Sequence, residues 1–166
     1  MELCRIDVAT EVSMLAAFSA APRQGHLAAV LHVYAYLKAH SRSRLVLDPG
    51  YLPEVIVPDY DWTDFYGDVV EPIPPDQPEP RGKAAQTTAF VDSDHAGNVV
   101  TRRSHSGIFI FVNNALIKSF SKKQNTVESS TYGSEMVAMR LAQDFNVEMR
   151  IKLKMFGVPI NGAVNV

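Results

Sequence analysis

The chain contains a single cysteine, Cys4, among its 166 residues. One thiol cannot form a disulfide within the chain, so the sequence excludes a disulfide-stapled fold and is compatible with a reducing compartment. The sequence also lacks an apolar run of transmembrane length and shows no evident signal peptide. These absences predict a cytoplasmic protein with no membrane among its partners.

Charge of one sign is missing from two stretches, although the net charge is only −2. Residues 49–80 carry eight acids and no base, whereas residues 101–124 carry five bases and no acid. A protein that contacts a phosphate backbone gathers basic side chains, so the second stretch indicates a nucleic-acid partner. Lysines that merely keep a hairpin soluble are the alternative interpretation.

Proline is concentrated in one region: eight of the ten prolines fall between Pro49 and Pro80. Proline fixes φ and removes a hydrogen-bond donor, so this region is not an ordinary helix or central strand. It predicts an acidic linker over residues 49–88, of which the aromatic part packs on a domain. The chain then divides into a helical segment, residues 1–48, this linker, and a main domain, residues 89–166.

The first segment predicts two helices within residues 7–40, separated at Pro22. Apolar residues recur at helical spacing before and after this proline, and Asp7 is a candidate cap for the first helix. The short connection favours an antiparallel helical hairpin. His26 and His32 are interpreted as packing or surface residues, and Leu45–Leu47 as a short strand.

The main domain opens with a strand that carries acids, Phe90-Val91-Asp92-Ser93-Asp94-His95-Ala96-Gly97. Alternate residues of a strand share a face, which places the Asp92 and Asp94 carboxylates about 7 Å apart. Two such carboxylates repel unless a cation lies between them, and oxygen ligands suit magnesium. Asp94 with Gly97 also suits a turn, and for Asp94 that interpretation is favoured. For Asp92, deeper in the apolar run, a functional role is favoured.

A hairpin and a long helix follow. Two strand-like runs, residues 107–112 and 115–120, are separated by Asn113-Asn114, and asparagine tolerates the positive φ of a tight turn. The first run is apolar on both faces and is therefore expected at the centre of the sheet. Good helix formers continue from about Ser130 to Phe156, where Gly157-Val158-Pro159 ends the helix. Glu135 lies at the border of its apolar surface, where solvated glutamates are common.

Several motifs in this order resemble the ribonuclease H domain of copia-type retrotransposon polyproteins. They are Val91-Asp92-Ser93-Asp94-His95-Ala96-Gly97, Arg102-Arg103-Ser104-His105-Ser106-Gly107, Phe120-Ser121-Lys122-Lys123-Gln124, and Thr126-Val127 followed by Glu135. The chain departs from the family pattern at His95 and at Tyr132-Gly133. Residues 1–48 are similar to the end of the reverse transcriptase of the same polyproteins.

The resemblance implies an α/β fold, an incomplete ribonuclease H-like domain of three antiparallel strands and a central helix, preceded by the helical hairpin. It implies hydrolysis of the RNA strand of RNA:DNA hybrids with two Mg²⁺ ions, in which Asp92 and Glu135 are catalytic metal ligands. Asp94 is an additional candidate ligand. The implied partners are an RNA:DNA hybrid, or another nucleic acid, and the rest of the polyprotein. The residues expected to contact nucleic acid are Arg102, Arg103, Ser104, Lys122, Lys123 and Gln124.

The C-terminal segment leaves the enzymatic status open. Ala163–Val166 resembles the start of the fourth strand, and the third carboxylate of the family lies beyond it. The chain alone is therefore expected to show little nuclease activity. A non-catalytic nucleic-acid-binding or interaction remnant is the main alternative. A phosphohydrolase of the haloacid dehalogenase type is disfavoured, because His95-Ala96-Gly97 follows Asp94 where that family has Ser or Thr and an aliphatic residue.

Overall fold

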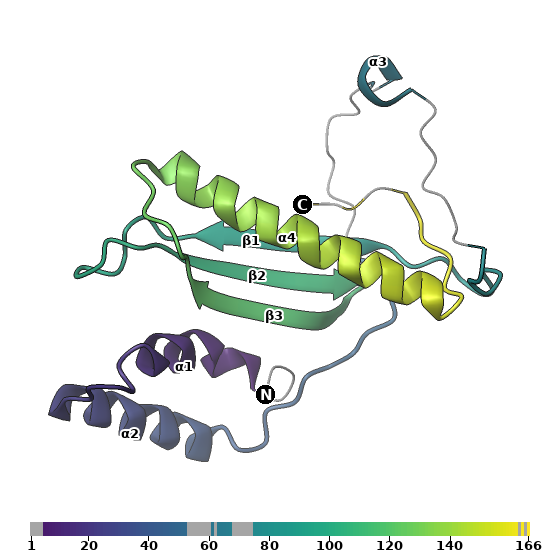
Figure 1. The fold of residues 1–166 in the computed structure, drawn as a ribbon. Helices are drawn as coiled ribbons and strands as arrows, with labels where there is room; N and C mark the ends of the chain where they lie inside the picture. Colours follow the sequence, from purple (N-terminus) through teal and green to yellow (C-terminus); the bar gives the residue numbers. More distant parts are fainter. Residues whose placement is uncertain (1–4, 53–60, 62, 68–74, 163, 165) are drawn as a thin grey trace.

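The protein has a mixed α/β fold in which a three-stranded antiparallel sheet lies between one long helix and a helical hairpin (Figure 1). The computed structural model describes the chain except for residues 1–4, 53–60, 62, 68–74, 163 and 165. In chain order the elements are a 3₁₀ turn (Ile6–Val8), α1 (Ala9–Ala16), α2 (Gln24–Ala39), α3 (Thr63–Tyr66), β1 (Thr87–Ser93), β2 (His105–Val112), β3 (Ala115–Lys123) and α4 (Thr131–Met155). No described helix is long and apolar enough to cross a membrane.

The sheet has the order β1-β2-β3, which confirms the prediction that β2 is central. β1 pairs antiparallel with β2, with Asp92 opposite Gly107 and Ser93 opposite Ser106. β2 then pairs with β3 through a two-residue turn, as predicted, and Asn113 adopts a φ of 54° there. A register shift between Ile110 and Phe111 interrupts this second pairing.

The hydrophobic core lies on one face of the sheet, between the strands and α4. Ala89, Ile108, Ile110 and Ala142 are buried there, and partly buried apolar side chains surround them: Val91, Phe120, Leu141, Phe145 and Met149. Ala142 and Ala138 are fully buried on α4. Because alanine is small, these positions let the helix axis approach the sheet closely.

Both ends of α4 follow the signals in the sequence. At its start the Ser130 hydroxyl accepts a hydrogen bond from the Gly133 N–H at 3.2 Å, which satisfies one free donor of the first turn. At its end Gly157 has a φ of 68°, a conformation that favours glycine after a helix. The last turn carries Lys152 and Lys154, which complement the negative end of the helix dipole.

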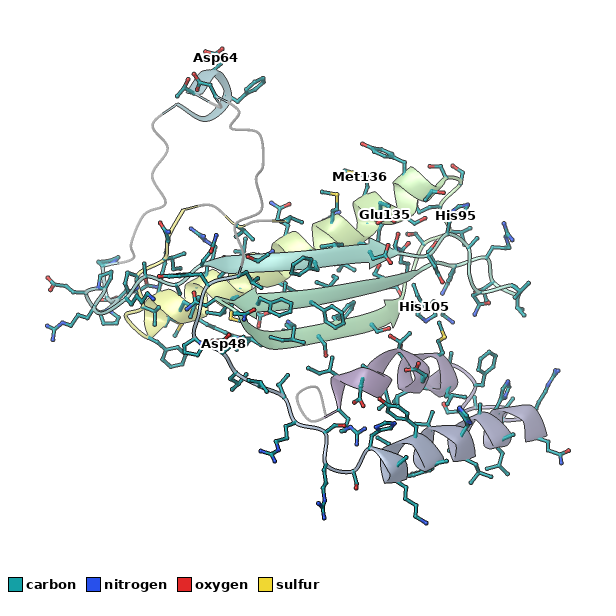
Figure 2. All side chains as sticks on the ribbon, turned by 180° about the vertical axis from the view of Figure 1, so that it is seen from behind. Asp48, Asp64, His95, His105, Glu135 and Met136 are labelled. Carbon is teal, nitrogen blue, oxygen red and sulfur yellow. The ribbon has the colours of Figure 1, made fainter. Side chains whose placement is uncertain are left out.

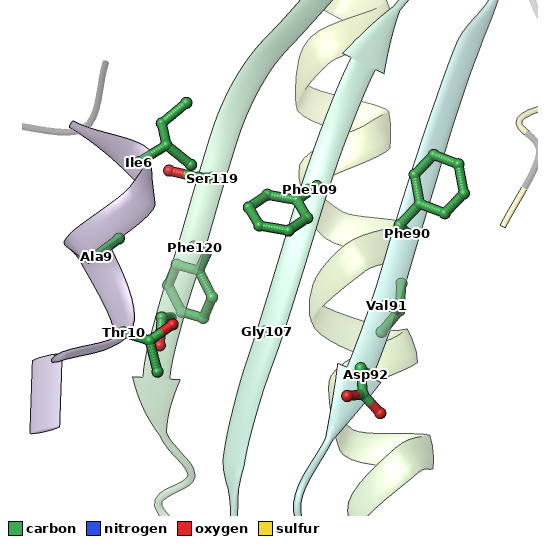
Figure 3. Close-up of a pocket in the computed structure, with 11 residues that line it drawn as sticks. Ile6, Ala9, Thr10, Phe90, Val91, Asp92, Gly107, Phe109, Ser119 and Phe120 are labelled. Carbon is green, nitrogen blue, oxygen red and sulfur yellow. The ribbon is translucent and has the colours of Figure 1, made fainter. Parts of the chain in front are cut away.

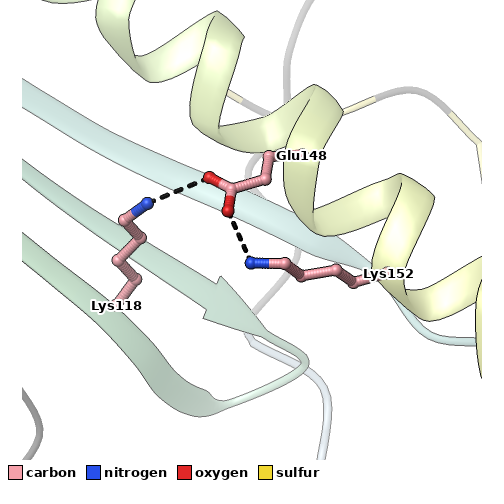
Figure 4. Close-up of polar contacts among 3 residues, drawn as sticks. All are labelled: Lys118, Glu148 and Lys152. Carbon is pink, nitrogen blue, oxygen red and sulfur yellow. Dashed lines mark hydrogen bonds and ion pairs between the residues drawn. The ribbon is translucent and has the colours of Figure 1, made fainter.

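An exposed charge cluster joins α4 to β3. Glu148 accepts hydrogen bonds from Lys152, four residues along the helix, and from Lys118 of β3 at 3.2 Å (Figure 4). These two lysines hold the pKa of Glu148 below its usual value, with Lys152 the larger cause. The Lys118 ammonium also lies 3.6 Å from the centre of the Phe145 ring.

The β2–β3 turn binds two other segments of the chain. The Asn114 amide donates to the Asp48 carboxylate at 2.7 Å, and the Asn114 N–H donates to the Gly50 carbonyl at 2.7 Å. On the other side of the turn Asn113 exchanges hydrogen bonds with the backbone of Gln86. The Tyr51 hydroxyl donates to the Ala84 carbonyl at 2.8 Å. Tyr51 and Ala84, the two ends of the segment between them, therefore lie side by side next to the sheet.

The predicted helical hairpin is present as α1 and α2. His26 packs as predicted: its ring stacks on Phe18 with 4.2 Å between the centroids. Asp7 does not cap α1; it lies inside the 3₁₀ turn and forms an ion pair with Arg5 at 2.7 Å. The strand predicted at Leu45–Leu47 is also wrong, because this exposed segment pairs with no strand among the described residues.

The segment after α4 pairs once with the sheet. Ile160 forms an isolated parallel bridge with Ala85, just before β1, and Asn161 donates to the Ala85 carbonyl at 2.8 Å. Two of the four residues predicted to begin a fourth strand, 163 and 165, lie outside the described residues, as does much of the predicted acidic linker. β1 begins at Thr87, inside the range predicted as linker.

Candidate functional site: a groove between the first helix and the sheet

The face of the sheet opposite α4 is only partly covered. Side chains alternate along β1, so Ala89 and Val91 face the core while Phe90 and Asp92 face the other way. On β2, Phe109 faces the same way as Phe90. Phe90 and Phe109 are 48% and 43% exposed, which leaves two aromatic rings half in solvent. This face therefore has apolar surface that the described chain does not fill.

α1 lies along one side of this face and forms a groove with it (Figure 3). The cavity has a volume of about 340 Å³, enough for one or two side chains of a ligand. Its lining comes from the 3₁₀ turn and α1, from β1 and β2, and from β3: Ile6, Ala9, Thr10, Phe90, Val91, Asp92, Gly107, Phe109, Ser119, Phe120 and Ser121.

Asp92 supplies the only charged side chain of the groove lining. Its neighbour across the strand pair is Gly107, and a β-carbon on Gly107 would approach the described chain no closer than 3.9 Å, at the Asp92 carbonyl. The absence of a side chain at Gly107 leaves the space beside Asp92 open. Asp92 is exposed and has no hydrogen-bond or ion-pair partner among the described residues. A carboxylate at the end of an apolar groove favours a ligand with a positive charge.

The other predicted catalytic residue lies elsewhere. Glu135 is half-buried in the first turns of α4, and Figure 2 shows it at the same end of the sheet as His95. Asp92 points to the opposite face of the sheet from α4. No three His, Cys, Asp or Glu side chains of the described chain are grouped closely enough to hold a metal ion. This observation does not test the predicted pair of Mg²⁺ ions, so the magnesium site with Asp92 and Glu135 as ligands stays a prediction.

Asp94 has a structural role. Its carboxylate accepts a hydrogen bond from the His105 N–H, and its own N–H donates to the His105 carbonyl at 3.1 Å. These bonds close the loop between β1 and β2. Gly97 packs against the same carboxylate, as the turn interpretation of this segment requires.

Two of the residues predicted to contact nucleic acid are buried. The Ser104 hydroxyl, 1% exposed, accepts a hydrogen bond from the Ala96 N–H at 3.0 Å. Gln124, 4% exposed, donates to the Ser106 hydroxyl and to the Ser134 carbonyl, both at 2.9 Å. Ser104 thus holds the loop between β1 and β2, and Gln124 ties the strand ends to the start of α4.

The four basic residues of the predicted nucleic-acid surface remain accessible. Arg102 and Lys122 are exposed, while Arg103 and Lys123 are half-buried. Arg102 adopts a φ of 57°, in the turn that the Asn98 side chain caps. Nothing in this arrangement tests a nucleic-acid partner, which stays a prediction.

Reasoning from the sequence missed the groove itself. Phe109 belongs to the run predicted at the centre of a covered sheet, and Ile6, Ala9 and Thr10 belong to a segment predicted as separate from the main domain. One signal was available: Gly107 interrupts an apolar strand, and such a glycine often marks a close approach of a ligand or of another backbone. The position of α1 against the sheet depends on long-range packing that no local pattern reports.

The chain is similar to a protein named secreted RxLR effector protein 161 from Plasmopara viticola. The two sequences are 26% identical over 154 residues, which cover 93% of this chain and 86% of that protein. No family model matches the chain. No solved structure matches it significantly.

This similarity contradicts the assignment to a copia-type retrotransposon polyprotein. It overturns the function inferred from that assignment, a polyprotein fragment for RNA:DNA hybrid hydrolysis, and nothing supports the alternative of a nucleic-acid-binding remnant. The cytoplasmic location is contradicted too, because the similar protein is a secreted effector. The motifs behind the resemblance have structural roles here: Asp94, Gly97, Ser104 and Gln124 fix loops and strand ends.

Proposed function

We propose that this protein is a secreted effector-type protein that binds a partner in the groove between α1 and the sheet. The supporting similarity extends over nearly the whole chain and most of the secreted effector it matches. The chain has no Arg-x-Leu-Arg tetrapeptide, so its proposed secretion rests on this whole-length similarity.

The observation that carries the binding proposal is the combination of two half-exposed aromatic rings with one unpaired carboxylate. Phe90 and Phe109 offer apolar surface, and Asp92 lies two residues after Phe90 on the same face of β1. The ligand that fits is a peptide segment with an apolar side chain for the rings and a lysine or arginine for Asp92. Arginine suits this site best, because its guanidinium both stacks on aromatic faces and pairs with carboxylates.

Binding is tested with a panel of short peptides in matched pairs, in which an arginine is replaced by the neutral, nearly isosteric citrulline. The readout is the shift of backbone amide signals of β1 and β2 on titration. We expect arginine peptides to shift the signals of Phe90, Phe109 and their neighbours, and citrulline peptides to bind about tenfold more weakly. A factor of ten corresponds to about 1.4 kcal/mol, a modest value for a charged hydrogen bond at an exposed site.

The variant Asp92→Asn removes the charge and keeps the shape of the side chain. Asp144→Asn is the matched control, because Asp144 is an exposed carboxylate on α4 outside the groove. Asp92→Asn is expected to abolish the preference for arginine, and Asp144→Asn to leave it intact. The proposal is contradicted if Asp92→Asn prefers arginine over citrulline peptides as strongly as Asp144→Asn does. It is also contradicted if the peptides shift only amide signals outside the groove.

Secretion is tested in the organism that expresses the chain. Quantitative mass spectrometry of culture filtrate and of washed cells compares this protein with an abundant intracellular enzyme as a leakage control. Enrichment in the filtrate above that control supports the proposal, and recovery in cells alone contradicts it. The two tests are independent, so a failure of one leaves the other interpretable.

The finer fold prediction, an incomplete ribonuclease H-like domain, is also a proposal. Its support is the β1-β2-β3 meander with α4 across one face and the parallel bridge between Ala85 and Ile160. An experimental structure tests it: a further strand parallel to β1 beside Thr87–Ser93 would support it, and an edge occupied by a helix would contradict it.

A further inference from the structure

α2 is apolar on nearly every side, yet none of its residues is buried. Its 16 residues include one charged side chain, Lys38, and few other polar ones. Helices with this composition are normally buried in the folded assembly, because so much apolar surface in water is unfavourable. The described chain covers α2 from one direction only: α1 lies between α2 and the sheet (Figure 1).

The burial pattern divides α2 into two apolar faces. The half-buried face contains His26, Val30, Val33 and Leu37, which recur every three or four residues, and His26 stacks on Phe18. About a third of a turn away lies a second face, here called the outer stripe and made of Leu27, Leu31 and Tyr34. These three side chains are 59%, 60% and 65% exposed. Their spacing of four and three residues places them on one line along the helix.

We propose that the outer stripe binds the outer stripe of a second copy of this chain, with the two α2 helices antiparallel about a twofold axis at Leu31. A twofold axis requires a self-complementary surface. With Leu31 on the axis, Leu27 lies opposite Ala35 of the second copy, and Tyr34 lies opposite Ala28. Leu27 and Tyr34 then each face an alanine, and only Leu31 meets its own copy on the axis, so the two surfaces can interdigitate.

The electrostatics of this arrangement are also favourable. The only charged residue within α2, Lys38, lies opposite the uncharged Gln24 of the second copy, with the cap residue Arg23 as the nearest like charge. Antiparallel helices place opposite ends of their dipoles side by side. The net charge of −2 gives little repulsion between whole chains.

The size of the surface sets the expected strength. α2 is about 24 Å long, and one helix pair covers less than the about 800 Å² per partner of a standard interface. Phe18, in the connection between α1 and α2, stacks on His26 of the half-buried face, so it is not counted in this area. We therefore expect a dimer with a dissociation constant in the micromolar range.

Sedimentation velocity over a concentration series tests the proposal on the full chain. Wild type is expected to shift from monomer to dimer across the micromolar range, with little effect of salt because the contact is apolar. Leu31→Glu places two carboxylates on the axis and is expected to weaken the dimer more than tenfold. Val127→Glu is the control, because Val127 is similarly exposed, at 57%, but lies in the loop before α4.

The proposed pairing of Gln24 with Lys38 of the second copy is tested separately, by the effect of charge changes on the dissociation constant. Gln24→Lys opposes Lys38 and should weaken the dimer, whereas Gln24→Glu should tighten it by roughly two- to fivefold, as expected of an exposed ion pair. Circular dichroism melts check that each variant remains folded, as expected for exposed positions. A wild-type monomer at every concentration up to the millimolar range overturns the proposal, as does dimerisation unchanged by Leu31→Glu. Binding of the monomer to phosphatidylserine vesicles through Leu31 also overturns it, since the stripe would then be a membrane surface.

Discussion

Gly97 provides the sharpest test of how the loop between β1 and β2 is held. A β-carbon at this position would lie 2.0 Å from Oδ2 of Asp94 and 2.7 Å from its Cγ, far inside contact distance. In Gly97→Ala the Asp94 carboxylate has to move. It then loses the hydrogen bond that it accepts from the His105 N–H.

The expected cost is that of one hydrogen bond to an ionised acceptor at an exposed site, about 1.5 kcal/mol. For a chain of this size such a loss lowers the melting temperature by roughly 3–6 °C. Urea denaturation followed by circular dichroism measures the free energy of unfolding directly. Gly25→Ala is the matched control: no atom lies within 4 Å of its added β-carbon, and alanine should stabilise α2 by about 0.5–1 kcal/mol.

A double-mutant cycle separates this mechanism from a general effect on the backbone. Asp94→Ala loses the same hydrogen bond, so adding Gly97→Ala to it should cost almost nothing further. The coupling free energy should then be close to the whole cost of Gly97→Ala. Additive costs in the double variant, or a Gly97→Ala variant as stable as wild type, would refute this account of the loop.

Three further predictions concern stability. Ile110→Ala empties a position that is 0% exposed, and should lower the free energy of unfolding by about 2–5 kcal/mol in urea titrations. Ser130→Ala removes the cap of α4 and should cost about 1 kcal/mol in the same assay, whereas the exposed Ser129→Ala should cost much less. The Gly50 N–H and the Asn114 amide hold the pKa of Asp48 below its usual value of 3.8. Because the folded-state pKa is lowered, this stabilisation is present above that value and is lost as the pH falls through the lowered pKa. The melting temperatures of wild type and Asp48→Asn should therefore differ at neutral pH and converge in acid, and a constant difference would contradict the assignment.

Local signals in the sequence predicted much of the fold. Asn113-Asn114 between two apolar runs predicted the hairpin, and Ser130 and Gly157 lie at the two ends of the predicted long helix. These predictions succeeded because the turn and the caps depend on neighbouring residues alone. The strand at Leu45–Leu47 failed because strand formation needs a partner, and the sequence does not report whether one is near.

The candidate site was harder to predict. The sequence places Asp92 on a strand and Glu135 on a helix, but it does not state which face of the sheet the helix covers. A shift of one residue in the alternation moves a side chain to the other face, and in this fold Asp92 faces away from α4. The retrotransposon interpretation failed for a related reason: serines, a glutamine and an aspartate that resembled a functional pattern serve to fix loops and strand ends.

The contacts of the β2–β3 turn have a consequence for how this chain can change in length. Asn113 and Asn114 bind Gln86, Gly50 and Asp48, and Tyr51 meets Ala84, so the chain departs from and rejoins the sheet at one point. Residues added or removed between those ends leave these contacts intact, and doubling the length of a loop costs only about 0.6 kcal/mol in closure entropy. Because of these contacts, we expect the acidic, proline-rich stretch to tolerate insertions while the sheet and α4 remain unchanged.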